Sequence, residues 1–157
     1  MDKIVQAKDL VIEAGRELFQ AGLIARTGGN VSSRLDGERL LITASGKEYL
    51  TLTRKDIVPV RISDLTYEGE TRPSSELKIH RELYRLRDDV GFIIHTHQEY
   101  ASAVSAMGLS AIQLSNAYES IGRRVYCGDY GLPGTEKLCR NTIKAVEKAE
   151  GNAVILR

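Results

Sequence analysis

Apolar residues recur at two different spacings along the first third of the chain, and the spacing predicts which segments are helices and which are strands. From residue 3 to residue 21 apolar or small side chains repeat every three or four positions, which predicts an amphipathic helix that ends at Gly22. The stripe of this helix consists of Ala7, Leu10, Val11, Ala14 and Leu18. The turn-forming stretch 27–34 leads into a strand, and Asp36-Gly37 then predicts a hairpin to a second strand at 39–43.

The same two patterns alternate over the rest of the chain. Further strands are expected at 58–62, 91–94 and 153–157, and further helices at 75–87, 99–107 and 135–150. The first of these further helices takes its apolar contacts from Leu77, Leu83, Tyr84 and Leu86. Because no internal repeat or linker interrupts the pattern, we expect one α/β domain over residues 1–157, with helices around a central sheet.

Composition narrows the classes of function. The 157 residues are 42% hydrophobic, which is enough for a core without disulfide bonds, so we expect Cys127 and Cys139 to be reduced structural thiols. With a net charge of +1, the chain lacks the excess of basic residues that is typical of a nucleic-acid-binding protein. No apolar run approaches the roughly 20 residues that span a bilayer, and the N-terminus lacks a signal-peptide pattern. We therefore expect a cytoplasmic protein with neither a nucleic-acid nor a membrane partner.

Two of the three histidines form the sequence His95-Thr96-His97, directly after the apolar run 91–94. Alternate side chains of an extended strand share one face, so both imidazoles are expected to point the same way. That arrangement suits one metal ion, whereas an isolated His-x-His pair is also common as ordinary core or edge residues. The pair is therefore a candidate metal site.

Three turns rich in glycine and hydroxyl groups predict an anion site if they converge. They are Gly28-Gly29-Asn30 with Ser32, Ser45-Gly46, and Ser74-Ser75. Glycines let backbone N–H groups approach an anion, hydroxyls donate further hydrogen bonds, and a helix N-terminus adds partial positive charge. Each turn taken alone is equally compatible with a purely structural role.

Glu76 is a candidate general base next to the Ser74-Ser75 turn. A carboxylate is favoured at a helix N-terminus in any case, but beside a divalent cation it could abstract a proton bound to carbon. His80, four residues later, shares a helix face with Glu76, and we expect it to serve in packing or to support the site indirectly. A catalytic zinc site usually has three protein ligands, and the candidates for the third are Glu76, His80 and a residue from another subunit or beyond the chain end.

Five blocks of the chain, in this order, resemble the class II aldolase/adducin family, whose members include fuculose-phosphate aldolase and ribulose-phosphate 4-epimerase. The blocks are Thr27-Gly28-Gly29-Asn30-Val31-Ser32, Thr43-Ala44-Ser45-Gly46, Pro73-Ser74-Ser75-Glu76, His95-Thr96-His97 and Tyr130-Gly131-Leu132-Pro133-Gly134-Thr135. The resemblance implies a three-layer α/β/α fold with a central, mostly antiparallel sheet, assembled as a homotetramer.

The resemblance also implies roles for individual residues. His95 and His97 match zinc ligands, one Zn²⁺ per subunit, and Glu76 matches the acid/base that also contacts the metal. The matches to the family's phosphate-binding positions are Gly29, Asn30, Ser45, Gly46, Ser74 and Ser75. The implied partner is thus a small sugar phosphate, and the implied reaction is cleavage of a ketose 1-phosphate to dihydroxyacetone phosphate and an aldehyde.

Two departures from the family pattern keep alternatives open. The family takes a third zinc histidine from just after a strand like 153–156, and Leu114 stands near the place of an active-site tyrosine of fuculose-type aldolases. We therefore expect the chain to be C-terminally incomplete relative to the family. The alternatives are a sugar-phosphate 4-epimerase, a methylthioribulose-phosphate dehydratase, and a non-catalytic assembly module like the head domain of adducin.

Overall fold

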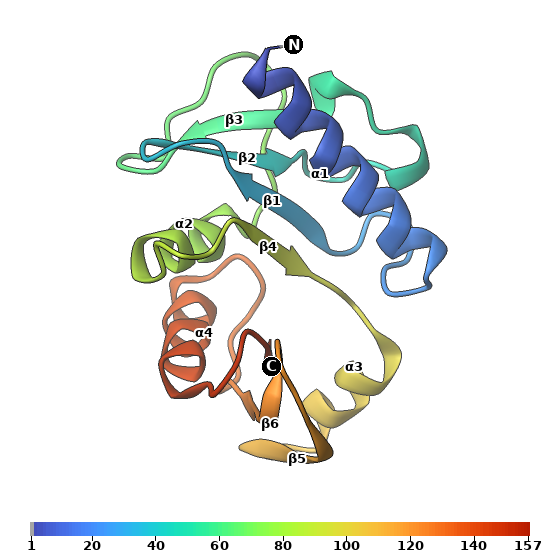
Figure 1. The fold of residues 1–157 in the computed structure, drawn as a ribbon, viewed down its shortest axis with the longest axis vertical. Coiled ribbons are helices and arrows are strands. Elements are labelled where there is room, and N and C mark those ends of the chain that lie inside the picture. The colour runs from blue at the N-terminus through green and yellow to red at the C-terminus, as the bar shows by residue number, and fades with distance from the viewer. Residues whose placement is uncertain (1) are drawn as a thin grey trace. The chain divides into compact units, whose positions relative to one another are not determined.

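The computed structural model describes residues 2–157, which form two compact units divided after Gln98 (Figure 1). The first unit contains a four-stranded antiparallel sheet with the strand order β3-β2-β1-β4. Its strands are β1 (Asn30–Arg34), β2 (Arg39–Thr43), β3 (Ile57–Arg61) and β4 (Phe92–His95). Its helices are α1 (Lys3–Gln20), α2 (Leu77–Leu86) and the short 3₁₀ turns η1 (Tyr49–Thr51) and η2 (Arg54–Asp56).

The sheet of the first unit has a separate apolar core on each face. On one face α1 packs through Val11 and Ile12 against β1 and β2, in a cluster that includes Val31 and Leu41. The opposite face packs against α2, in a cluster formed by Leu40, Ile42, Val58, Val60, Leu77 and Tyr84. Successive strand residues point to opposite faces, so Leu40 and Leu41 serve different cores. The expected three-layer α/β/α arrangement with an antiparallel sheet is confirmed.

Helix α1 ends where the sequence predicts, although one position of its stripe is wrong. Gly22 has φ +70°, and the amides of Gly22 and Leu23 donate to the carbonyls of Phe19 and Leu18, which is a Schellman C-cap. Leu10, however, is 53% exposed. The buried residues are instead Val11, Ile12 and Gly15. A Cβ at residue 15 would lie 2.6 Å from the Tyr49 ring, so only glycine allows that approach.

The hairpin between β1 and β2 forms as predicted from Asp36-Gly37. The Asp36 carboxylate accepts hydrogen bonds from the amides of Glu38 and Arg39, and the two strands pair with Ser33 opposite Leu41. Strand β1 pairs on its other side with β4, in a register that places Asn30 opposite His95. This register brings residues 65 positions apart in the sequence to the same end of the sheet.

The second unit contains α3 (Glu99–Ala106), β5 (Ala111–Tyr118), β6 (Gly122–Cys127), α4 (Glu136–Lys148) and β7 (Val154–Ile155). Its three strands form a second sheet, in which β5 and β6 are antiparallel and β6 and β7 are parallel. The Thr135 side chain caps α4 by accepting a hydrogen bond from the Leu138 amide, at the start of the helix predicted over 135–150. The β5–β6 hairpin was not predicted, because the apolar alternation of β5 is limited to Ile112 and Leu114 and most of the strand is exposed.

Two further expectations concern the whole described chain. Cys127 and Cys139 are buried thiols and no disulfide joins them. Among residues 2–157 there is no helix that is both long and apolar enough to cross a membrane.

Candidate active site

Two stripes of polar side chains face each other between β1 and α2. Asn30 and Ser32 alternate along β1 and therefore share one face of the sheet. Glu76, His80 and Tyr84 follow one another at intervals of four residues, which places them on one face of the helix. Hydrogen bonds join the two stripes over their whole length, and each of the five residues is at most 9% exposed.

Glu76 is the N-cap residue of α2 and lies one residue before the first helical residue, Leu77. The predicted helix over 75–87 already included Glu76. Its amide donates to the Ser74 hydroxyl at 3.3 Å, and its Oε2 accepts a hydrogen bond from Asn30 Nδ2 at 2.8 Å. The same oxygen contacts His95 Nδ1. Burial alone would raise the pKa of Glu76, but the hydrogen bonds from His95 and Asn30 outweigh burial and lower it. Glu76 is therefore a buried but ionised carboxylate at neutral pH.

His95 is the last residue of β4, and His97 lies two residues beyond the strand, so the pair does not sit within one strand as expected. The rings nevertheless lie close together, with 5.1 Å between their centroids and an angle of 56° between their planes. The backbone amide of His97 donates to the Leu23 carbonyl, which fixes the chain after β4. Partial burial and the neighbouring His95 lower the pKa of His97, so its imidazole is neutral at pH 7.

Gly28 and Gly29 let the preceding loop lie directly against the two histidines. A Cβ at Gly28 would be 2.9 Å from His97 Nδ1. Gly29 has φ +76°, and a Cβ there would be 2.5 Å from the His95 carbonyl oxygen. Both positions therefore require glycine because the loop packs closely against the two histidines, whether or not the loop also contacts an anion.

The donor types at this site suit a zinc ion only in part. Neutral imidazole and carboxylate are ordinary zinc ligands, and His95 lies against both His97 and Glu76. Within residues 2–157, however, no three His, Cys, Asp or Glu side chains are arranged as a complete metal-binding cluster. The residues present can thus supply part of a coordination sphere.

Four of the six predicted phosphate-binding residues lie on two segments that an isolated β-bridge joins. Ala44 forms an antiparallel bridge with Pro73, and the Ser45 amide donates to the Arg72 carbonyl. Because the bridge is antiparallel, Ser45 lies opposite Arg72 and Ser74 lies opposite Thr43, so the two predicted pairs leave the bridge on opposite sides. Ser45, Gly46 and Ser75 are exposed, whereas Ser74 is buried.

The other two predicted phosphate-binding residues lie at the histidines. Gly29 packs against the His95 carbonyl. Asn30 is only 4% exposed, and both ends of its side-chain amide have protein partners, Glu76 and His80. Asn30 therefore links the predicted base to the interior of the unit.

Sequence reasoning treated Tyr84 as an apolar contact and Ser32 as a turn residue, and it missed their hydrogen bonds to each other and to His80. Ser32 Oγ lies 2.6 Å from His80 Nδ1 and 2.9 Å from the Tyr84 hydroxyl. His80 is 1% exposed, in agreement with the expectation that it serves in packing and support. The signal was present in the spacing, because polar residues at four-residue intervals on a helix mark one polar stripe in an otherwise buried face.

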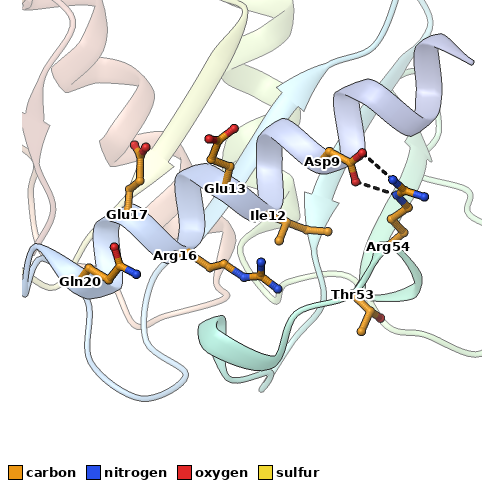
Figure 2. Close-up of a pocket in the computed structure, with 8 residues that line it drawn as sticks. All are labelled: Asp9, Ile12, Glu13, Arg16, Glu17, Gln20, Thr53 and Arg54. Carbon is orange, nitrogen blue, oxygen red and sulfur yellow. Dashed lines mark hydrogen bonds and ion pairs between the residues drawn. The ribbon is translucent and has the colours of Figure 1, made fainter. Parts of the chain in front are cut away.

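A groove on the first unit lies away from these residues. It runs along α1, and its lining includes Arg16, Glu13, Glu17 and the ion pair of Asp9 with Arg54 (Figure 2). Arg16 donates to the Leu52 carbonyl and Arg54 is paired with Asp9, so both guanidinium groups are already engaged. None of the predicted site residues lines this groove.

Comparisons with known proteins agree with the motifs. The family model "Class II Aldolase and Adducin N-terminal domain" matches residues 9–157. A curated relative, 5-deoxy-D-ribulose 1-phosphate aldolase of Bacillus thuringiensis serovar kurstaki, is 33% identical over 133 residues. That alignment covers 83% of this chain and 62% of the relative, so the chain spans less than two thirds of that protein.

Solved structures give the same result. A structure of L-fuculose 1-phosphate aldolase is 33% identical, with a TM-score of 0.87 over 96% of this chain and 71% of that chain. The L-fuculose-1-phosphate aldolase of Thermus thermophilus is 28% identical, with a TM-score of 0.74 over 99% of this chain and 75% of that chain.

Proposed function

Because this chain belongs to the class II aldolase and adducin family, we propose that it acts as a zinc-dependent aldolase on a ketose 1-phosphate, releasing dihydroxyacetone phosphate and an aldehyde. The observation that carries the proposal is the contact of the Glu76 carboxylate with His95, whose ring lies 5.1 Å from that of His97. Relatives named as aldolases favour this reaction over epimerisation or dehydration. The proposal includes a cytoplasmic homotetramer.

His95 and His97 would hold the zinc ion, with Glu76 beside it. The lowered pKa of His97 supports this role, because only a neutral imidazole offers a lone pair to a metal. Bound zinc would supply Lewis-acid stabilisation of the negative charge that develops on the ketose oxygens. Glu76 is the third ligand predicted from this chain, and its carboxylate lies against His95.

Glu76 would move the proton on the three-carbon fragment. Cleavage breaks the C3–C4 bond, leaves its electron pair on C3, and releases the proton of the C4 hydroxyl as the aldehyde forms. A proton must then reach C3, and Glu76 is the ionisable oxygen group that lies against His95. The lowered pKa of Glu76 keeps its carboxylate ionised, so that it can first take up a proton and then deliver that proton to C3.

The exposed turns would bind the phosphate of the substrate. Ser45 and Gly46 follow the bridge of Ala44 with Pro73, and Ser74 and Ser75 lie just ahead of the N-terminus of α2, so backbone amides and hydroxyl groups of both segments could donate to an anion. Gly29 and Asn30 complete the set that the family resemblance implies, although the side-chain amide of Asn30 is already bonded to Glu76 and His80.

Metal analysis and a cleavage assay test the proposal together. The purified chain should contain zinc and should release dihydroxyacetone phosphate from at least one member of a panel of ketose 1-phosphates, measured with a coupled dehydrogenase. Glu76→Gln should keep the zinc content and the circular dichroism spectrum but lose turnover. Glu70→Gln is the matched control, because Glu70 is exposed on a loop.

Three results would contradict the proposal. Equal turnover of Glu76→Gln and wild type would remove Glu76 from the mechanism. A chain that binds no zinc and cleaves no substrate, yet still forms tetramers by light scattering, would favour the assembly module. Formation of an epimer without dihydroxyacetone phosphate would favour the epimerase.

A further inference from the structure

We propose that Ser32, His80 and Tyr84 are positioning residues, which together with Asn30 form a hydrogen-bond relay of fixed direction that aims an amide N–H at the Glu76 carboxylate. The relay runs from Tyr84 through Ser32, His80 and Asn30 to Glu76. Its geometry stands by itself, whereas its catalytic importance rests on the proposed function of Glu76.

The direction of the last two bonds follows from the carboxylate. An ionised carboxylate only accepts hydrogen bonds, so the Asn30 atom at 2.8 Å from Oε2 must be the NH₂ group. The carbonyl end of the same amide then faces His80 Nε2. Because a carbonyl oxygen only accepts, Nε2 must carry the proton.

The proton on Nε2 fixes the other side of the imidazole. His80 is 1% exposed, and its two ring nitrogens face Ser32 and Asn30 rather than a carboxylate, so the ring is neutral and has a single N–H. Burial, together with the nearby His95, lowers the pKa of His80 to about 3, in agreement with this state. Nδ1 therefore accepts, and the Ser32 hydroxyl donates to it at 2.6 Å.

The hydroxyl of Tyr84 completes the chain. Ser32 has used its only proton on His80, so the contact of 2.9 Å between Ser32 and Tyr84 must have the tyrosine as donor. Burial raises the pKa of Tyr84 to about 12, which keeps its proton in place. Ser32 is 0% exposed and Tyr84 is 1% exposed, so the bonds run through the interior.

The fixed direction matters because an asparagine amide can otherwise turn over. A flipped Asn30 would place its carbonyl oxygen against the carboxylate of Glu76 and its NH₂ group against the N–H of His80, and both contacts would be repulsive. The relay excludes that orientation and holds one carboxylate oxygen at a defined place. Both Asn30 and His95 contact Oε2, so neither occupies Oε1.

The tautomer of His80 tests the relay without reference to activity. The full chain, labelled with ¹⁵N-histidine, contains only three histidines, and comparison with His80→Gln assigns the signals of His80. Long-range ¹H–¹⁵N correlation should show a neutral His80 with its proton on Nε2. A proton on Nδ1, or a doubly protonated ring at neutral pH, would overturn the proposal.

Turnover tests the positioning role. His80→Gln can place its own NH₂ group where Nε2 stood and so keeps a donor to Asn30, whereas His80→Leu removes it. Loss of a hydrogen bond in a charged network predicts that His80→Leu lowers kcat by about tenfold to a hundredfold with little change in KM, and that His80→Gln recovers most of the loss. Zinc content, measured on each protein, should be the same.

The outcomes separate the two proposals. Equal kcat values of His80→Gln and His80→Leu, or a loss that appears in KM alone, would overturn the positioning role. Ser33→Ala, which removes a buried hydroxyl that has no partner among residues 2–157, is the control that should leave kcat unchanged. A wild-type chain that cleaves no sugar phosphate would overturn the proposed function, and the tautomer would then decide the relay alone.

Discussion

Ser32 and Ser33 are neighbouring, equally buried serines that should respond in opposite ways to the same substitution. They are 0% and 3% exposed and point to opposite faces of β1. Ser32 bonds to His80 and Tyr84, whereas Ser33 Oγ has no hydrogen-bond partner within the described chain. Replacing either by alanine removes one oxygen atom, so the change in volume is matched.

The bonds set the magnitude of each effect. Ser32→Ala leaves His80 Nδ1 unpaired, at about 1–3 kcal/mol, and removes one bond of the Tyr84 hydroxyl, at about 1 kcal/mol, while the bond of that hydroxyl to the Ile93 backbone remains; the free energy of unfolding should therefore fall by roughly 2–4 kcal/mol. Ser33→Ala breaks no bond and removes a hydroxyl that gained nothing from burial, so the free energy of unfolding should stay the same or rise by up to about 1 kcal/mol.

Urea denaturation followed by circular dichroism measures both changes, since the chain has no tryptophan for fluorescence. For a urea m-value of about 1–3 kcal/mol per molar, Ser32→Ala should lower the midpoint by roughly 1 M or more. Equal effects of the two substitutions, or a larger loss for Ser33→Ala, would refute the reasoning that the bonds of Ser32 stabilise this layer.

Three further predictions concern the same unit. Burial holds the pKa of His80 at about 3 in the folded chain, against 6.5 in the unfolded chain, so between these pH values only the unfolded state takes up a proton. The free energy of unfolding should therefore fall as the pH falls from 6.5 to 3, with the unfolding equilibrium constant rising by up to tenfold per pH unit. Urea titrations at each pH should show a smaller fall for His80→Gln. Arg34→Met should lower the free energy of unfolding by roughly 2–4 kcal/mol, because the guanidinium donates to three backbone carbonyls at the end of α2 and beyond it; a smaller loss than that of Arg34→Lys would contradict this. Gly29→Ala should lower the melting temperature clearly more than Gly46→Ala, since both have positive φ but only Gly29 would collide with the His95 carbonyl, and equal shifts in calorimetry would exclude that contact as the cause.

Local signals predicted the elements that have strong caps or turns. The Schellman cap at Gly22, the Asp36 turn and the Thr135 cap all lie within a few residues of the bonds that they form, so the sequence alone is sufficient. The β5–β6 hairpin was missed because the apolar alternation of β5 covers only Ile112 and Leu114, which is too short to predict a strand. Leu10 was misplaced because the buried residues of α1 are its neighbours Val11 and Ile12 together with Gly15, and apolar spacing alone does not separate these positions.

The candidate site was predicted residue by residue but not as a network. The motif positions named Glu76, His95 and Asn30, and the structure brings their side chains together. Their contact depends on the pairing of β1 with β4, which places Asn30 opposite His95, and no local pattern encodes that register. The catalytic and metal-binding roles of these residues stay predictions.

The four-residue spacing of Glu76, His80 and Tyr84 limits where residues can be inserted into or deleted from this protein. Each residue turns an α-helix by about 100°, so deleting or inserting one residue between Glu76 and Tyr84 would swing one end of the stripe away from β1 while the other end stayed in place. Natural variation in length should therefore be absent from this helix and should concentrate in the surface segment 63–72, whose residues are mostly exposed. The site therefore requires the number of residues between Glu76 and Tyr84 to stay constant.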